Sequence, residues 1–100
     1  MRDAIALERA GVFAIVLEGV PREVASMITA EVSVPTIGIG AGPDCDGQIL
    51  VLHDLLGLSG YNFKFVRPFA QGTDMIKDAL KKYSDAVASK DFPNIEESFE

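Results

Sequence analysis

The stretch "VFAIVLEGVP", residues 12–21, decides the fold of this chain. Six apolar residues, three of them β-branched, run without polar alternation up to Glu18. Such a run is typical of a strand covered on both faces, as in a parallel sheet. Pro21 suits the first position of a helix, where its missing N–H would have no partner in any case. The stretch therefore predicts a strand at 12–18 that turns directly into a helix, with a carboxylate at the junction.

Helices are predicted on both sides of this strand. Residues 3–10 have the pattern of a helix end, and Gly11 lies where its C-terminal cap is expected. After the strand, a helix is predicted at 21–32, with Glu23 near its positive end. The apolar stripe of that helix is expected to consist of Val24, Met27 and Ile28.

A second strand is predicted at 35–40, and the loop "AGPDCDG" follows it. Residues 48–57 leave two alternatives open. Their length and apolar spacing favour a buried helix, for which Asp46 could provide the cap, whereas their apolar core also suits a strand.

The last third of the chain contains a third strand candidate, 63–67, and the clearest helix, 73–90. Thr73 is expected to cap this helix, and Pro93 lies just past its end. The residues expected on its apolar side are Ile76, Ala79, Leu80, Tyr83 and Val87.

Strands that alternate with helices predict an α/β fold with a parallel sheet. Three strands are too few for an open doubly wound sheet, and a (β/α)₈ barrel takes about 250 residues. The expectation is therefore that residues 1–100 form a single partial domain, the C-terminal segment of a larger α/β protein.

The composition describes an acidic globular chain, 48% hydrophobic and 24% charged, with net charge −6 and pI about 4.6. Nucleic acid and membrane surfaces are poor partners for such a chain. The N-terminal residues lack the pattern of a signal peptide, and no apolar run reaches the roughly 18 residues of a membrane span. The one cysteine, Cys45, lies between two aspartates and is expected to be an ordinary thiol of a cytoplasmic protein.

Glu18 is the candidate catalytic residue. Alternation places it on one strand face with small residues, and the same alternation in the second strand suggests Thr36, Gly38 and Gly40 beside it. The bulky faces, including Phe13, would then meet the helices, and Glu18 would face the interior at the carboxyl end of its strand, where barrel enzymes hold catalytic groups. The alternative, a solvated loop residue or a partner of a basic side chain, stays open.

Other motifs carry weaker signals. "GIGAG" lacks the full dinucleotide-binding spacing, and close packing of backbone explains its glycines better than an anion site. His53 is expected to be a hydrogen-bonded structural residue. Asp44, Asp46 and Asp54 match no metal-ligand spacing.

Several stretches together resemble one family. "LEGVP", "IGIGAGPDCDGQILVLHDLLGL", "FKFVRPF" and a terminal helix ending in "FP" are similar, in order and spacing, to ketopantoate hydroxymethyltransferases (3-methyl-2-oxobutanoate hydroxymethyltransferases). The resemblance runs from about Asp3 to Phe99. It implies a (β/α)₈ TIM barrel, of which this chain would supply about three βα units, strands six to eight.

The resemblance also implies an activity. The family transfers a hydroxymethyl group from 5,10-methylenetetrahydrofolate to 3-methyl-2-oxobutanoate, giving 2-dehydropantoate for pantothenate and coenzyme A synthesis. Glu18 matches the catalytic glutamate of "LEGVP", the proton acceptor. The ligands of the family's Mg²⁺ are expected in the N-terminal half, so none is assigned here and the chain alone is expected to be inactive. The family also implies a homo-oligomer.

Two alternatives to this interpretation remain. One is a non-catalytic remnant that serves as an interaction module. The other is a different barrel enzyme acting on 2-oxo acids, of the phosphoenolpyruvate/isocitrate-lyase superfamily, against which the uninterrupted "GIGAGPDCDGQILVLHD" argues.

Overall fold

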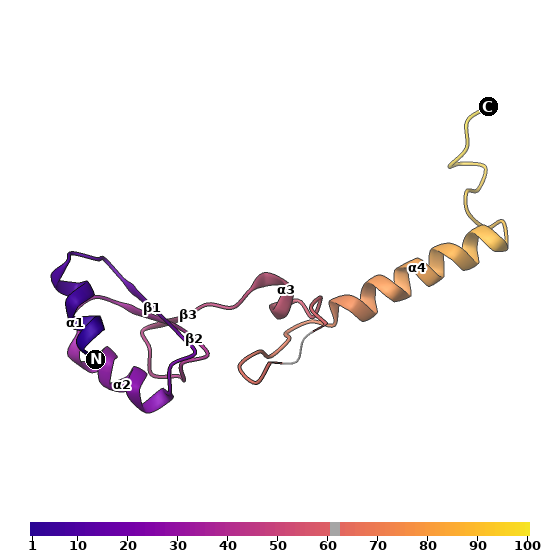
Figure 1. The fold of residues 1–100 in the computed structure, drawn as a ribbon. Helices are drawn as coiled ribbons and strands as arrows, with labels where there is room; N and C mark the ends of the chain where they lie inside the picture. Colours follow the sequence, from indigo (N-terminus) through magenta and orange to yellow (C-terminus); the bar gives the residue numbers. More distant parts are fainter. Residues whose placement is uncertain (61–62) are drawn as a thin grey trace.

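The structure is a computed structural model that describes residues 1–60 and 63–100. Helices and strands alternate over its first half, as the sequence predicts (Figure 1). The elements in chain order are α1 (Arg2–Arg9), β1 (Ile15–Glu18), α2 (Arg22–Glu31), β2 (Thr36–Ile39), β3 (Gly47–Gln48), α3 (Leu52–Leu55) and α4 (Gly72–Ala88).

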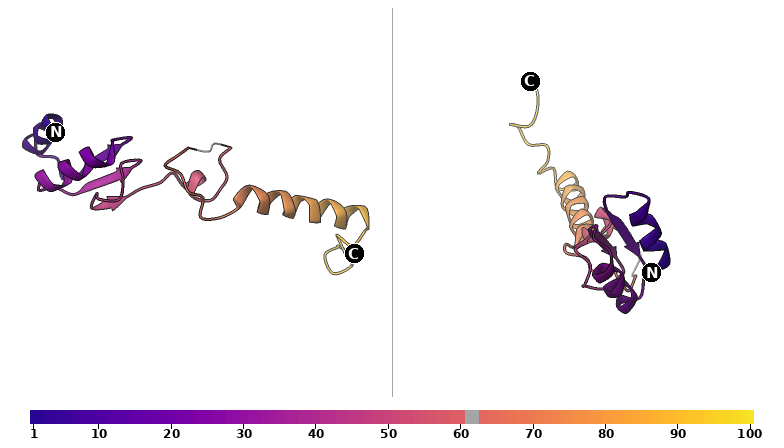
Figure 2. Two further views of the ribbon diagram at one scale, coloured as in Figure 1. Left: turned by 90° about the horizontal axis from the view of Figure 1, so that it is seen from below. Right: turned by 90° about the vertical axis from the view of Figure 1, so that its left-hand side faces the viewer.

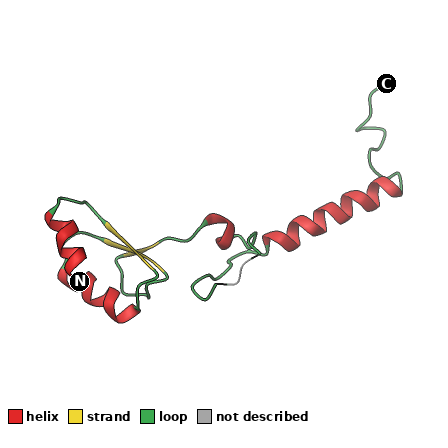
Figure 3. Ribbon diagram, viewed as in Figure 1, coloured by secondary structure: helices red, strands yellow, loops and turns green. Residues whose placement is uncertain are grey.

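The strands form one parallel sheet in the order β1-β2-β3, so the predicted α/β class and the parallel pairing of the first two strands are confirmed (Figure 3). The prediction of a third strand at 63–67 is wrong. There the chain turns, and the Val66 amide donates to the Phe63 carbonyl oxygen at 3.1 Å. A local turn is favoured because Pro68 has no N–H for a ladder. The third strand is β3 instead.

The two faces of β1 differ sharply in burial. Ile15 and Leu17 are buried, whereas Val16 is 55% exposed and Glu18 is also exposed. The buried face packs against α1 and α2, and the other face is open, as the views from two sides indicate (Figure 2). Phe13, expected on the helix-facing side, precedes the strand and is 92% exposed, because β1 begins three residues later than predicted.

The hydrophobic core lies between the sheet and its two covering helices. Its buried members are Ala4, Ile15, Leu17, Ala25, Ile28, Val32 and Ala41. The predicted stripe of α2 is therefore only partly correct. Ile28 is buried, but Val24 and Met27 are exposed, since Ala25 is the side chain that fits closest under the sheet.

The predicted helix ends are correct in one case and wrong in two. Gly11 has φ +94°, a conformation that favours glycine, and its amide donates to the Glu8 carbonyl oxygen at the end of α1. Asp46 does not cap α3, which begins after Val51. Thr73 does not cap α4, because its hydroxyl donates to the Gly57 carbonyl oxygen. In residues 48–57 only Leu52–Leu55 form a helix, and none of its residues is buried, so the prediction of a buried helix is correct only in part. The apolar core forms no strand, because β3 ends at Gln48.

The last third of the chain extends away from the sheet. α4 points outward in every view, and the radius of gyration is 22.7 Å, against about 13 Å for a compact chain of this length (Figures 1 and 2). The predicted apolar side of α4 is exposed throughout; Leu80, for example, is 62% exposed. No helix of the described ranges is both long and apolar enough to cross a membrane.

Candidate functional site at the carboxyl ends of β1 and β2

Glu18 is the last residue of β1, and its main chain is held firmly. It pairs in register with Ile39, and the Gly19 amide donates to the Ile39 carbonyl oxygen at 2.9 Å. Gly19 has φ +62°, so a residue with a side chain would be strained at the turn that follows. The Glu18 carboxylate makes no hydrogen bond or ion pair with any residue that the structure describes. It is therefore a carboxylate on a fixed backbone with its oxygens open to a ligand.

The neighbours of Glu18 differ from those that alternation suggested. Partners in register share a face, so Glu18 lies beside Ile39, and Gly38 lies beside Leu17 on the opposite face. A Cβ at Gly38 would come 3.0 Å from the sulfur of Cys45, which shows that this glycine makes room for the loop and not for a ligand. The prediction that Thr36, Gly38 and Gly40 share the face of Glu18 is wrong for the first two.

A buried polar network explains this register. Thr36 is 0% exposed, and its hydroxyl lies 2.8 Å from that of Thr29, which in turn donates to the Ala25 carbonyl oxygen at 2.8 Å. The Asp46 carboxylate accepts from the Thr36 amide at 2.9 Å and from its hydroxyl at 3.3 Å. Because these partners lie under the sheet, Thr36 must point toward α2. Asp46 therefore has a structural role in joining β2 to the loop before β3.

A groove opens at the same end of the sheet, beyond Glu18, with a volume of about 620 Å³. The residues that line it are Val20, Pro21, Arg22, Gly40, Gly42, Lys64 and Phe65. Gly42 has φ +81°, and a Cβ there would come 2.5 Å from the Cβ of Arg22. The glycines of "GIGAG" thus let two segments pack closely, as the sequence predicts.

The charged side chains at this groove are Arg22 and Lys64. Arg22 Nε donates to the Glu23 carboxylate at 3.0 Å, and this hydrogen bond lowers the pKa of Glu23. Lys64 forms no ion pair within residues 1–60 and 63–100. Sequence reasoning missed Arg22, Lys64 and Phe65 as site residues, because only the fold brings "FKF" next to the start of α2.

The remaining candidates do not converge on this site. His53 is exposed and its side chain makes no hydrogen bond in the described part of the chain, so the prediction of a hydrogen-bonded histidine is wrong. Cys45 is a free thiol packed against the core. Asp54 accepts a hydrogen bond from the Ser59 hydroxyl. Among the described residues, no three His, Cys, Asp or Glu side chains gather in a metal-binding group.

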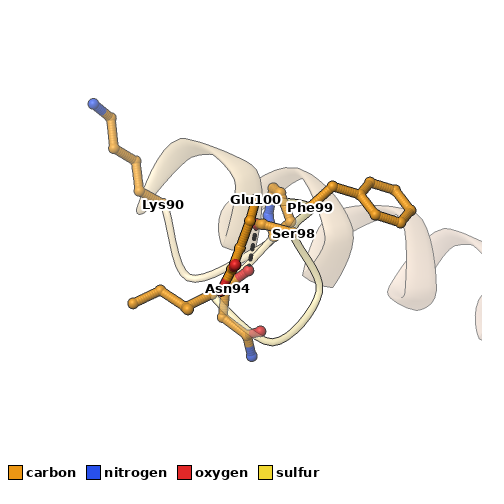
Figure 4. A pocket seen from close by; sticks show the side chains of 7 residues that line it. Lys90, Asn94, Ser98, Phe99 and Glu100 are labelled. Carbon is orange, nitrogen blue, oxygen red and sulfur yellow. Dashed lines mark hydrogen bonds between the residues drawn. The ribbon is translucent and has the colours of Figure 1, made fainter.

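A separate hollow of about 460 Å³ lies in the C-terminal tail, between Lys90 and Glu100 (Figure 4). Its walls are exposed tail residues, among them the fully exposed Phe99. The seven residues that line the hollow all come from positions 90–100, and none belongs to the sheet. The candidate functional site is therefore the groove at the strand ends and not this hollow.

A parallel sheet with a free carboxylate at a strand's carboxyl end is the arrangement of α/β enzymes. The family model described as ketopantoate hydroxymethyltransferase matches residues 1–95. The chain is 59% identical to the 3-methyl-2-oxobutanoate hydroxymethyltransferase of Koribacter versatilis, over 99% of this chain and 34% of that protein. It is 56% identical to the enzyme of that name from Pelobacter propionicus, over 99% and 37%. The chain belongs to the ketopantoate hydroxymethyltransferase family and spans about a third of these relatives' length.

Proposed function

We propose that the whole protein containing this chain transfers a hydroxymethyl group from 5,10-methylenetetrahydrofolate to 3-methyl-2-oxobutanoate and forms 2-dehydropantoate. The family match over residues 1–95 supports the reaction class, since both relatives above are named 3-methyl-2-oxobutanoate hydroxymethyltransferases. The observation that supports Glu18 as the residue for this chemistry is its free carboxylate at the end of β1.

Glu18 is the proposed proton acceptor. A general base must lie within hydrogen-bond reach of the proton it removes, here the one on C3 of the oxo acid. Removal leaves an enolate, whose C3 forms a bond to the methylene carbon of the folate. The two bonds from that carbon to the folate nitrogens break. One water molecule supplies the hydroxyl group and one proton, and the C3 proton taken up by Glu18 is the second, so each nitrogen receives one proton.

The rigid position of Glu18 supports this role. The Gly19–Ile39 hydrogen bond fixes the strand end, and side chains carried by strands are held more precisely than those on loops. The open face of β1 and β2, with Val16 and Ile39 around the carboxylate, would give the base an apolar surrounding once the rest of the protein covers it.

The proposed architecture is a (β/α)₈ TIM barrel in which residues 1–100 form one partial domain at the C-terminal end. Mg²⁺ is the proposed metal of the whole protein, where it would hold the oxo acid. The described side chains do not fit it, since none gather in a metal-binding group, so its ligands are assigned to the remaining two thirds of the protein and no step is drawn through it. A cytoplasmic homo-oligomer with small-molecule partners is proposed on the same family grounds.

The test is an assay of the purified full-length protein with both substrates and Mg²⁺. We expect 2-dehydropantoate, together with exchange of the C3 proton into deuterated water when the folate is left out. A non-catalytic interaction module would show neither. A 2-oxo-acid enzyme of another type would show exchange without hydroxymethyl transfer, and either result would overturn the proposal.

A further inference from the structure

The groove beyond Glu18 combines an aromatic wall with a positive end. Phe65 is about half exposed, and its ring lies 3.0 Å from the position that a Cβ at Gly40 would take. Phe65 stacks on Phe63 with ring centroids 5.7 Å apart and planes 11° from parallel, which fixes the orientation of the ring. A flat group that enters the groove therefore meets a preset aromatic ring over a glycine floor.

The charge of the groove differs from that of the chain. The net charge is −6, yet both ionisable residues that line the groove are basic. Arg22 already forms an ion pair with Glu23, whereas Lys64 has no ion-pair partner among the described residues. The groove therefore favours a ligand that carries both a ring, for Phe65, and an anionic group, for Lys64.

The groove joins two distant parts of the chain. Its lining includes Val20, two residues after the proposed base, and Lys64 from the segment after α3. A ligand that occupies the groove therefore contacts the chain just after β1 and Lys64 at the same time. The volume of about 620 Å³ lies in the usual range for a small-molecule site.

We propose that this groove binds the p-aminobenzoylglutamate end of the folate co-substrate, with its ring on Phe65 and a glutamate carboxylate at Lys64. This inference rests on the proposed function. Of the two proposed substrates only the folate carries both a ring and an anionic group distant from its reacting carbon. The oxo acid has no ring, and its one carboxylate is next to the ketone, so it fits neither feature of the groove.

The experiment is equilibrium binding of tetrahydrofolate, and of the neutral tetrahydropteroyl amide that lacks the glutamate and any other carboxylate, to the full-length protein. We expect Lys64→Ala to weaken tetrahydrofolate binding about threefold and to leave binding of the amide unchanged. Phe65→Leu should weaken both ligands, about fivefold, because both carry the ring. Lys77→Ala removes an equal charge from α4 and serves as the matched control, with no effect expected on either ligand.

Salt provides a second readout. Raising the salt concentration to about 0.5 M should remove the difference between wild type and Lys64→Ala but not the effect of Phe65→Leu, since only the first is electrostatic. Equal binding of tetrahydrofolate by wild type and Lys64→Ala at low salt would overturn the inference. A Lys64→Ala loss of the same size for both ligands would overturn it as well. These are binding measurements, so they test whether the groove binds the folate. The transfer assay tests the proposed function separately.

Discussion

Residues 1–48 and residues 52–100 differ in how far their apolar side chains are buried. Every buried apolar residue of the described chain lies at or before Ala41, and the sheet together with α1 and α2 encloses them. After α3, Gly72 is the one buried residue that the structure describes, and α4 leaves its apolar side exposed. The difference teaches that the βαβ unit is organised by its own contacts, whereas α4 has the pattern of a packed helix without a surface to pack on.

Two glycines allow the end of α3 and the start of α4 to pack closely. Gly57 has φ +71°, and a Cβ there would collide with the Ala70 carbonyl oxygen, while one at Gly72 would collide with the Leu56 carbonyl oxygen. Closely packed backbone thus holds the start of α4 against the end of α3.

The largest expected effect concerns the organised unit. Glu18→Gln in the full-length protein should lower turnover about 10²–10⁴-fold, because the amide keeps the shape of the side chain but cannot accept the proton. Binding of the oxo acid should change far less. The measurement is 2-dehydropantoate formation together with C3 exchange in deuterated water.

Glu31→Gln is the matched control for that substitution, since it neutralises an exposed carboxylate at the other end of α2. It should behave like wild type. If Glu18→Gln kept both rates near those of wild type, the base would have to lie outside this chain, and the organised unit would only support the fold.

The second prediction concerns the exposed face of α4. Leu80→Ala in the full-length protein should lower the free energy of unfolding by about 2–4 kcal/mol, provided that the whole protein covers this face. Lys77→Ala, on the same helix, should change it by less than about 0.5 kcal/mol. Urea unfolding measures both. A Leu80→Ala effect as small as that of Lys77→Ala would show that the face of α4 is open in the whole protein as well.

The third prediction concerns the network under the sheet. Thr36→Val keeps the shape but removes the hydroxyl that contacts Thr29 and Asp46, so it should destabilise the protein by about 1–2 kcal/mol. Ser33→Ala, an exposed neighbour, should be close to neutral. Thermal unfolding of the three proteins tests this. Equal stability of Thr36→Val and wild type would mean that apolar packing alone sets the register of β2.

The smallest expected effect is on the surface of α4. Lys81 donates to Asp85 at 2.9 Å across one helical turn, and both side chains are exposed. Lys81→Ala should therefore cost about 0.3–0.5 kcal/mol, and the loss should disappear in high salt. Urea unfolding at two salt concentrations measures it. A loss that persists at high salt would indicate that Lys81 packs against another part of the whole protein.

Local pattern was enough to predict most of the elements. The apolar run up to Glu18 and the residues around Pro21 predict β1 and α2, and the structure confirms both, shorter by one to three residues at their ends. The parallel pairing of β1 with β2 followed from the helix between them. The family resemblance, carried by short motifs, is confirmed by the match over residues 1–95. The role of Glu18 stays a prediction.

The sequence by itself determined the order of the elements, the parallel sheet and the position of a carboxylate at a strand end, because these depend on neighbours along the chain. Only the tertiary structure decided the register that places Ile39 beside Glu18, since a shift of one residue exchanges the two faces of a strand. That register depends on the contact of Thr36 with Thr29 and Asp46. The tertiary structure also decided that residues 63–67 form a turn near the groove, because a strand forms only where another strand is available to pair with it.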